Sequence, residues 1–265
     1  HFLNSQPADS VGHRALAVNL SDVVAMGASP RWATLSLTLP ELDRDWVNAF
    51  ATGFFQLADD HHVSLIGGDT TAGPLTVSVT VGGEVEPGRV LRRGGARPGD
   101  LIFLTGRIGG AATALSSTQA YSNPVLQKAL LYPQPPVALG QVLGSFAHSA
   151  IDLSDGLLAD LGHVLKASGN RGAQIEADQV PLFEASVALL GASRALELAL
   201  GGGDDYELCF TAPEDRCREI DAIGSQLERE IFCIGRVTEK GGCRVNGGQV
   251  NLKELSPGYQ HTWQV

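Results

Sequence analysis

The first third of the chain alternates between two patterns of apolar and polar positions. Apolar residues recur every three or four positions over residues 10–27 and again over residues 46–57. In residues 33–39 and 75–81, by contrast, every second residue is apolar. The first pattern predicts amphipathic helices and the second predicts half-buried strands. The start of the chain is therefore expected to mix helices with sheet.

Beyond residue 100, apolar runs typical of strands alternate with helical patterns as far as residue 237. This order indicates a layered α/β or α+β domain. Residues 118–136 interrupt the alternation with many Pro, Ser and Gln residues, and we expect a surface connection there. Residues 241–252 are expected to form a hairpin whose turn is the Asn-Gly-Gly of residues 246–248.

Length and composition indicate a globular protein of one large or two ordinary domains. The chain has 265 residues, of which 43% are hydrophobic and 18% charged, so a substantial core can form. Glycines, an arginine and a proline in residues 94–99 mark a plausible boundary. We therefore expect two domains, residues 1–95 and residues 96–265.

Charge, apolar segments and cysteine content argue against a nucleic-acid partner, a membrane-spanning protein and a secreted protein. The net charge of −10 and the lack of a Lys/Arg-rich run argue against a nucleic-acid partner. No apolar stretch approaches the length needed to span a membrane, and no signal peptide is visible. The four cysteines form no CxxC pair, which is typical of a reducing compartment. We expect a cytoplasmic protein.

The stretch with the most chemistry follows an apolar run that ends at Ile151. Residues 152–156 contain two aspartates three positions apart, and a helical pattern begins directly afterwards. Backbone N–H groups at such a helix start suit a phosphate. Asp152 and Asp155 would repel that phosphate unless a cation lies between them, and Mg²⁺ binds in this way. The competing interpretation is that Ser154 or Asp155 merely caps the helix.

Glycines precede aspartates at two further places. Residues 67–71 follow a predicted strand and carry Asp69, and residues 201–205 precede another strand and carry two aspartates. Asn19 and Asp22 lie three positions apart on the helix predicted near the start of the chain. A plain hairpin turn competes with ligand binding at residues 67–71, although such a turn does not require the Asp-Thr-Thr found there.

One polynuclear Mg²⁺–nucleotide site explains these stretches together. Ser154 and the backbone near Gly68 would donate to phosphate. The arginines of residues 89–97 either bind a polyphosphate tail or are solvated linker charges. The sequence has no Walker loop, no zinc-type His/Cys spacing and no nucleophile triad, and residues 106–110 resemble a dinucleotide turn only loosely. The proposed metal ligands are Asp22, Asp69, Asp152 and Asp155.

Four ordered segments resemble the motifs of the thiamine-monophosphate kinase family: residues 19–30, 67–73, 152–156 and 202–208. The resemblance covers essentially the whole chain. It implies an α+β fold of the aminoimidazole ribonucleotide synthetase type, with an N-terminal domain whose sheet joins a partner's in a homodimer and a C-terminal α/β domain. The implied reaction transfers the γ-phosphoryl group of ATP to thiamine monophosphate, giving thiamine diphosphate and ADP. Such a transfer needs alignment and charge neutralisation rather than a strong base.

The resemblance also implies roles for individual residues, carried over motif by motif. Mg²⁺ ligands would be Asp22, Asp69, Asp152 and Asp155. Residues in contact with ATP would be Gly68, Asp69, Arg93 and Ser154. Residues facing the thiamine phosphate would be His1, Asp204 and Tyr259.

Two departures from the family pattern affect these expectations. Asp204 stands where the family usually has Glu, so we expect a weaker or water-mediated substrate contact there. The family's upstream Gly-Asp-Asp and Ser/Thr-Asp segments, which supply further metal ligands, do not occur before His1. We therefore expect an incomplete metal site, and an inactive fragment if the polypeptide truly begins at this residue.

Three alternative functions compete with the kinase. The first is another ATP-dependent synthetase of the same superfamily, which also includes selenophosphate synthetase. The second is a non-catalytic nucleotide-binding or dimerisation module. The third is a Rossmann oxidoreductase, which rests only on residues 106–110.

Overall fold

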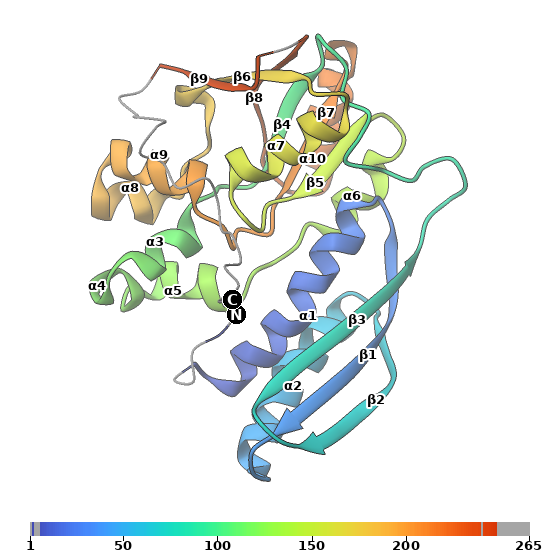
Figure 1. Cartoon of the computed structure of the whole chain (residues 1–265), viewed down its shortest axis with the longest axis vertical. Coiled ribbons are helices and arrows are strands. Elements are labelled where there is room, and N and C mark those ends of the chain that lie inside the picture. Colours follow the sequence, from blue (N-terminus) through green and yellow to red (C-terminus); the bar gives the residue numbers. More distant parts are fainter. Residues whose placement is uncertain (1, 3–5, 240, 248–265) are drawn as a thin grey trace, which may run out of the picture.

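The computed structural model describes residue 2, residues 6–239 and residues 241–247 (Figure 1). Two sheets divide the chain between them, each covered by helices. The first is built from the initial 84 residues. Its elements are α1 (Ala8–Ala25), β1 (Ser29–Leu39), α2 (Arg44–Asp60), β2 (Ser64–Ala72) and β3 (Thr76–Glu84).

The second sheet and its helices occupy the rest of the described chain. The elements are β4 (Leu101–Thr105), α3 (Gly110–Ser116), α4 (Thr118–Tyr121), α5 (Pro124–Leu131), α6 (Val137–Leu143), β5 (Ser149–Asp152), α7 (Leu157–Ala167), β6 (Gly172–Glu176), α8 (Glu184–Leu190), α9 (Ala192–Gly201), β7 (Leu208–Ala212), α10 (Cys217–Gln226), β8 (Ile231–Thr238) and β9 (Cys243–Asn246). Short 3₁₀ helices lie at Ala177–Gln179 and Glu214–Arg216. The α+β fold predicted from the sequence is confirmed.

The first sheet has the strand order β2-β1-β3, with β1 parallel to β2 and antiparallel to β3. Its apolar face packs on α1 and α2, where Leu20, Phe50 and Phe54 are almost fully buried. The alternating pattern predicted for residues 33–39 is confirmed, because Ala33 lies in this core while Ser36 is exposed. The opposite face of the sheet is largely polar.

The strand predicted to stop at residue 66 continues instead to Ala72, so the prediction of a glycine-rich strand tip is wrong. Strand β1 runs alongside and offers hydrogen-bonding partners over the whole of residues 67–71. The register shifts by one residue at Ile66, which forms a bulge before Gly67 pairs with Thr34. The glycines thus lie within a paired strand.

The second sheet has the strand order β5-β7-β4-β8-β6-β9 and is antiparallel except between β6 and β9. All of central strand β4 is buried, because α7 and α9 cover one face and α6 and α10 cover the other. Strand β9 pairs with β6 rather than with its neighbour β8. The second half of the hairpin predicted for residues 241–252 lies outside the described residues.

The surface connection predicted for residues 118–136 is wrong, because this segment contains helices α4 and α5. Asn123 caps α5 by accepting the backbone N–H groups of Val125 and Leu126, and Pro124 occupies the first turn. Leu126 and Leu130 then bury themselves against α3. These start signals were present in the sequence but were outweighed by its Pro and Gln content.

Helix α1 connects the two sheets (Figure 1). It contacts α2 and β3 on one side, and β5, α5 and α6 on the other. Gly140 of α6 permits a close approach to α1, since a Cβ atom there would lie 2.6 Å from the carbonyl oxygen of Val24. The end of α1 is therefore fixed against the second sheet. Among the described helices, none combines the length and the apolar character that crossing a bilayer requires.

We predict that Gly68→Ala destabilises the first sheet and that Gly67→Ala does not. Gly68 has a φ of +143°, and a Cβ atom there would lie 1.8 Å from the carbonyl oxygen of Leu35. A Cβ atom at Gly67 would have no described atom within 4 Å. We expect the first substitution to lower the free energy of unfolding by about 3 kcal/mol and the second by less than about 0.5 kcal/mol. Urea denaturation of both variants measures the difference, and equal losses would contradict the prediction.

Candidate active site

The end of strand β5 and the last turns of α1 bring two predicted site residues together. Asp152 ends β5 and is only 4% exposed. Its Oδ2 atom accepts a hydrogen bond of 2.9 Å from the Ser21 hydroxyl on α1. Asp22, the next residue, interacts electrostatically with Asp152. The fold thus brings Asp22 and Asp152, two of the four predicted metal ligands, near each other.

The two aspartates lie in an environment that disfavours their negative charge. Burial raises the pKa of Asp152 to about 6, and the charge of Asp22 adds to this effect. Partial desolvation also raises the pKa of Asp22, and the guanidinium group of Arg93 opposes the shift. Arg93 lies near both carboxylates, as expected for a residue of a polyphosphate site. A bound cation would relieve the remaining repulsion.

The loop between β5 and α7 is held by a residue that the sequence analysis did not select. The backbone N–H groups of Ser154, Asp155 and Gly156 all donate to Oδ2 of Asp160, at 3.1, 3.0 and 3.1 Å. The prediction that these N–H groups bind phosphate is therefore wrong for this structure, because a carboxylate within the chain already occupies them. Burial raises the pKa of Asp160 to about 7, in spite of these hydrogen bonds.

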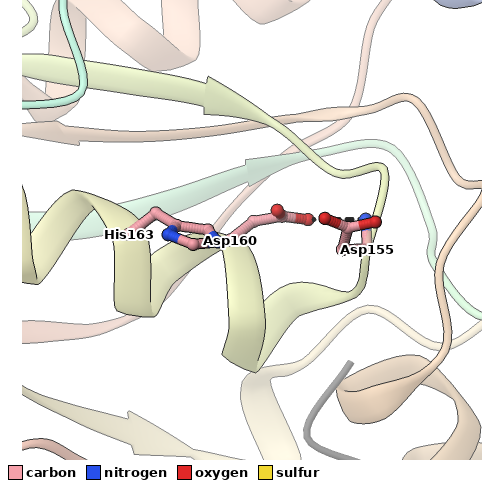
Figure 2. Close-up of side chains that lie close together, drawn as sticks. All are labelled: Asp155, Asp160 and His163. Carbon is pink, nitrogen blue, oxygen red and sulfur yellow. Dashed lines mark hydrogen bonds between the residues drawn. The ribbon is translucent and has the colours of Figure 1, made fainter. Parts of the chain in front are cut away.

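Asp155 emerges from this loop next to Asp160 and His163 (Figure 2). One ligand-type atom from each of the three side chains lies within 4.8 Å of the others. Asp155 is half-buried, Asp160 is buried and His163 is exposed. The carboxylates of Asp155 and Asp160 point toward one another from the loop and from α7 (Figure 2). Asp155 is thus presented at the surface above the start of the helix.

The glycine-rich segment before β7 packs directly on the same loop. The N–H of Asp204 donates to the carbonyl of Ser154 at 2.9 Å, and the N–H of Tyr206 donates to that of Leu153 at 2.8 Å. A Cβ atom at Gly203 would lie 2.1 Å from the carbonyl oxygen of Ser154, so only glycine fits. The glycines therefore let this segment approach the loop after β5 closely, which places Asp204 next to Ser154.

Asp204 is held by a second residue that the sequence analysis missed. The Arg14 guanidinium on α1 forms an ion pair of 2.6 Å with Oδ1 of Asp204 and donates to the carbonyl of Leu130 at 2.7 Å. The Tyr206 hydroxyl donates to the same Oδ1 atom at 2.9 Å. Asp204 and Tyr206 have φ values of +70° and +52°, a strained conformation that is common at functional sites. Arg14 precedes Ser21 by seven positions, or two helical turns, so the sequence alone could have placed both residues on the same face of α1.

Asp205 points away from this surface and fixes the turn after β4. Its Oδ1 atom accepts the N–H of Gly109 at 2.8 Å. Its Oδ2 atom is buried without a hydrogen-bond partner among the described residues. Burial raises the pKa of Asp205 well above its usual range. The loosely dinucleotide-like turn of residues 106–110 is therefore held by an internal carboxylate.

Asp69 is not brought to the other three predicted metal ligands within this chain. It pairs with Ser36 across β2 and β1 and is exposed. Paired residues project from the same side of a sheet, so Asp69 lies on the polar face, whereas α1 with Asp22 covers the opposite face. Gly68 pairs with Leu35 inside the sheet. Two predicted substrate residues, His1 and Tyr259, lie outside the described residues.

Comparison with known proteins gives consistent matches over nearly the whole chain. The family model of the N-terminal domain of AIR synthase related proteins matches residues 1–85, and that of the C-terminal domain matches residues 97–248. The thiamine-monophosphate kinase of Salmonella typhimurium is 44% identical over 247 residues, which are 90% of this chain and 75% of that protein.

Solved structures agree with the sequence matches. A crystal structure of thiamine-monophosphate kinase from Stenotrophomonas maltophilia is 46% identical, with a TM-score of 0.89 over 94% of this chain and 82% of that one. A structure described as AaThiL complexed with AMPPCP and TMP is 32% identical, with a TM-score of 0.86 over 99% of this chain and 83% of that one.

We predict that Asp152 makes the stability of the metal-free protein depend on pH. Its pKa is about 6 in the folded protein against an ordinary 3.8, so the unfolded chain releases this proton first as the pH rises. Rising pH therefore favours unfolding across this window, by up to about 3 kcal/mol. Asp152→Asn should remove this dependence.

Urea denaturation in a chelator, at pH 4 and at pH 8, checks this prediction. The free energy of unfolding of Asp152→Asn, relative to the wild type, should be higher at pH 8 than at pH 4. Asp178→Asn, on an exposed position, is the control and should follow the wild type. Parallel curves for wild type and Asp152→Asn would contradict the assignment.

Proposed function

Because this chain belongs to the thiamine-monophosphate kinase family of ATP-dependent enzymes, we propose that it transfers the γ-phosphoryl group of ATP to the phosphate of thiamine monophosphate. The observation that supports this most is the convergence of α1, β5 and the loop before α7 on one acidic surface. Asp22, Asp152 and Asp155 lie there with Arg93 beside them. The products would be thiamine diphosphate and ADP.

The residues of this surface fit Mg²⁺. Asp22 and Asp152 are neighbouring carboxylates, and Asp155 lies on the adjoining loop, so all three offer the hard oxygen ligands that this ion prefers. Their mutual repulsion favours a cation between them. When bound, Mg²⁺ would neutralise charge on the polyphosphate and on the transferred group.

The reaction does not require a strong general base from the protein. An ionised phosphate oxygen of thiamine monophosphate attacks the γ-phosphorus in line, and the bond to the bridging oxygen breaks as ADP leaves with the electron pair. The side chains of Arg93 and Ser154 would bind and orient ATP. Asp204 is paired with Arg14, so this ion pair rather than a free carboxylate would face the substrate phosphate. His1 and Tyr259 remain proposed substrate residues.

The position of Asp69 supports a homodimer. In the described chain β2 and β3 are the two edges of the first sheet, and the polar face bearing Asp69 is uncovered. A second copy joined at this sheet would bring its own Asp69 to the acidic surface of the first. We therefore propose that each site takes Asp69 from one subunit and Asp22, Asp152 and Asp155 from the other.

We further propose that the chain forms two domains and acts in the cytoplasm. The division into domains of residues 1–95 and 96–265 fits the separation of the two sheets. A cytoplasmic location is supported by the four cysteines, because all are free and one of them, Cys233, is exposed, as is usual in a reducing compartment.

We predict that Asp155→Asn abolishes turnover while the fold stays intact. The substitution removes a metal ligand without changing volume, and we expect kcat to fall at least about 100-fold, equivalent to roughly 3 kcal/mol of transition-state stabilisation. A coupled ADP-release assay with thiamine monophosphate, ATP and Mg²⁺ measures it. The assay should be run on this chain and on a version extended by the family's upstream segment.

Asp221→Asn, an exposed substitution on α10, is the matched control and should keep wild-type activity. An unchanged kcat in Asp155→Asn would rule out a ligand role for this residue. Absence of turnover in both wild-type versions would contradict the proposed substrate, and selenide or a ribonucleotide acceptor should then be tested.

We predict that Asp69→Asn and Asp155→Asn, each inactive alone, restore activity when combined in one dimer. A mixed dimer would carry one site with both substitutions and one intact site. Because one of its two sites is intact, the isolated mixed dimer should have about half of the wild-type activity per dimer. Co-expression with two different affinity tags isolates the mixed dimer for assay. A mixed dimer as inactive as its parents would show that Asp69 and Asp155 act within the same chain.

A further inference from the structure

We infer that Asp160 is a positioning residue, which holds the loop that presents Asp155 and Ser154 to the metal and nucleotide. This inference rests on the proposed function. The geometry is specific, because a single oxygen, Oδ2, accepts three consecutive backbone N–H groups at 3.0 to 3.1 Å. Asp160 is only 2% exposed, so solvent competes little with these hydrogen bonds.

The arrangement exceeds what capping the helix requires. A helix cap usually comes from the residue before the first turn, but here that residue is Gly156, which has no side chain and a φ of +115°. Asp160 reaches backward from the first turn instead, past Gly156 to the two residues that precede it. In a capping box, an acidic side chain of the first turn accepts the N–H of the residue before the helix. Asp160 accepts that N–H from Gly156 and also the N–H groups of the two preceding residues. The hydrogen bonds therefore fix a loop conformation as well as a helix start.

The same loop is fixed from its other side by the segment before β7. The carbonyl of Ser154 accepts the N–H of Asp204, and Gly203 packs against it. The backbone of residue 154 thus lies between the carboxylate of Asp160 and the loop that carries Asp204. Asp160 acts on Asp155 through the main chain, by limiting where its side chain emerges.

A ligand role is the alternative to a positioning role. Asp160 lies within 4.8 Å of Asp155 and His163, so all three side chains together could hold a cation. The two roles differ in what His163 does. A positioning Asp160 does not need His163, whereas a three-residue metal site loses affinity when His163 is removed.

The test compares Asp160→Asn, Asp160→Ala and His163→Gln with the wild type, in the chain extended by the family's upstream segment. The first readout is amide hydrogen exchange of residues 153–158 without metal. The second is Mn²⁺ affinity with a non-hydrolysable ATP analogue, measured by electron paramagnetic resonance. Thermal unfolding reports whether each variant is folded.

We expect faster exchange in both Asp160 variants, with the alanine variant fastest because asparagine keeps one acceptor oxygen. Mn²⁺ affinity should fall about 10-fold in Asp160→Asn and further in Asp160→Ala, while His163→Gln changes neither readout. If the alanine variant does not fold, the asparagine variant carries the test.

Two results would overturn the inference. The first is wild-type exchange at residues 154–156 together with wild-type Mn²⁺ affinity in Asp160→Asn. The second is a loss of affinity in His163→Gln as large as that in Asp160→Asn, which would make Asp160 a ligand. Failure of the wild type to bind Mn²⁺ with nucleotide would instead contradict the proposed function, and the exchange readout would still decide whether Asp160 fixes the loop.

Discussion

The rest of the site depends on the packing of α1 on β5, which holds the buried carboxylate of Asp152 beside Asp22, an exposed residue of α1. The hydrogen bond from Ser21 to Asp152 crosses between α1 and β5, and it partly offsets the loss of solvation that raises the pKa of Asp152. Without the packing of α1 on β5 and α6, Asp152 would be a strand end without its Ser21 partner, and Asp22 would not lie beside it. The acidic surface is therefore a product of helix packing.

Each carboxylate near this surface has a different compensation for its charge. Asp160 accepts backbone N–H groups, Asp204 is paired with Arg14, and Asp205 accepts the N–H of Gly109. Asp152 and Asp22 have Arg93 nearby and no comparable hydrogen-bond set. Asp152 and Asp22 are both proposed metal ligands, and a cation between them would supply the compensation that the chain does not.

Much of the fold could be predicted from sequence because its elements have one buried face. Periodicity found α1, α2, β1 and β3 for this reason. It failed at residues 67–71, where pairing with β1 rather than local preference keeps the chain extended. Within the site, aspartates beside glycines were recognisable. Arg14 was not, because its role arises from Asp204, 190 positions away in the chain.

Helix α1 belongs to two hydrophobic cores at once. Leu16 and Leu20 pack beneath the first sheet, while Val24 and Ala25 pack beneath the second. Neither sheet can lose its structure without exposing apolar surface that the other needs, so the two halves are coupled in unfolding as one cooperative unit. The same coupling limits motion, since a hinge between the sheets would have to bend or release this helix. Substrates must therefore enter the proposed site without a change in the separation of the two sheets, because both are packed on helix α1.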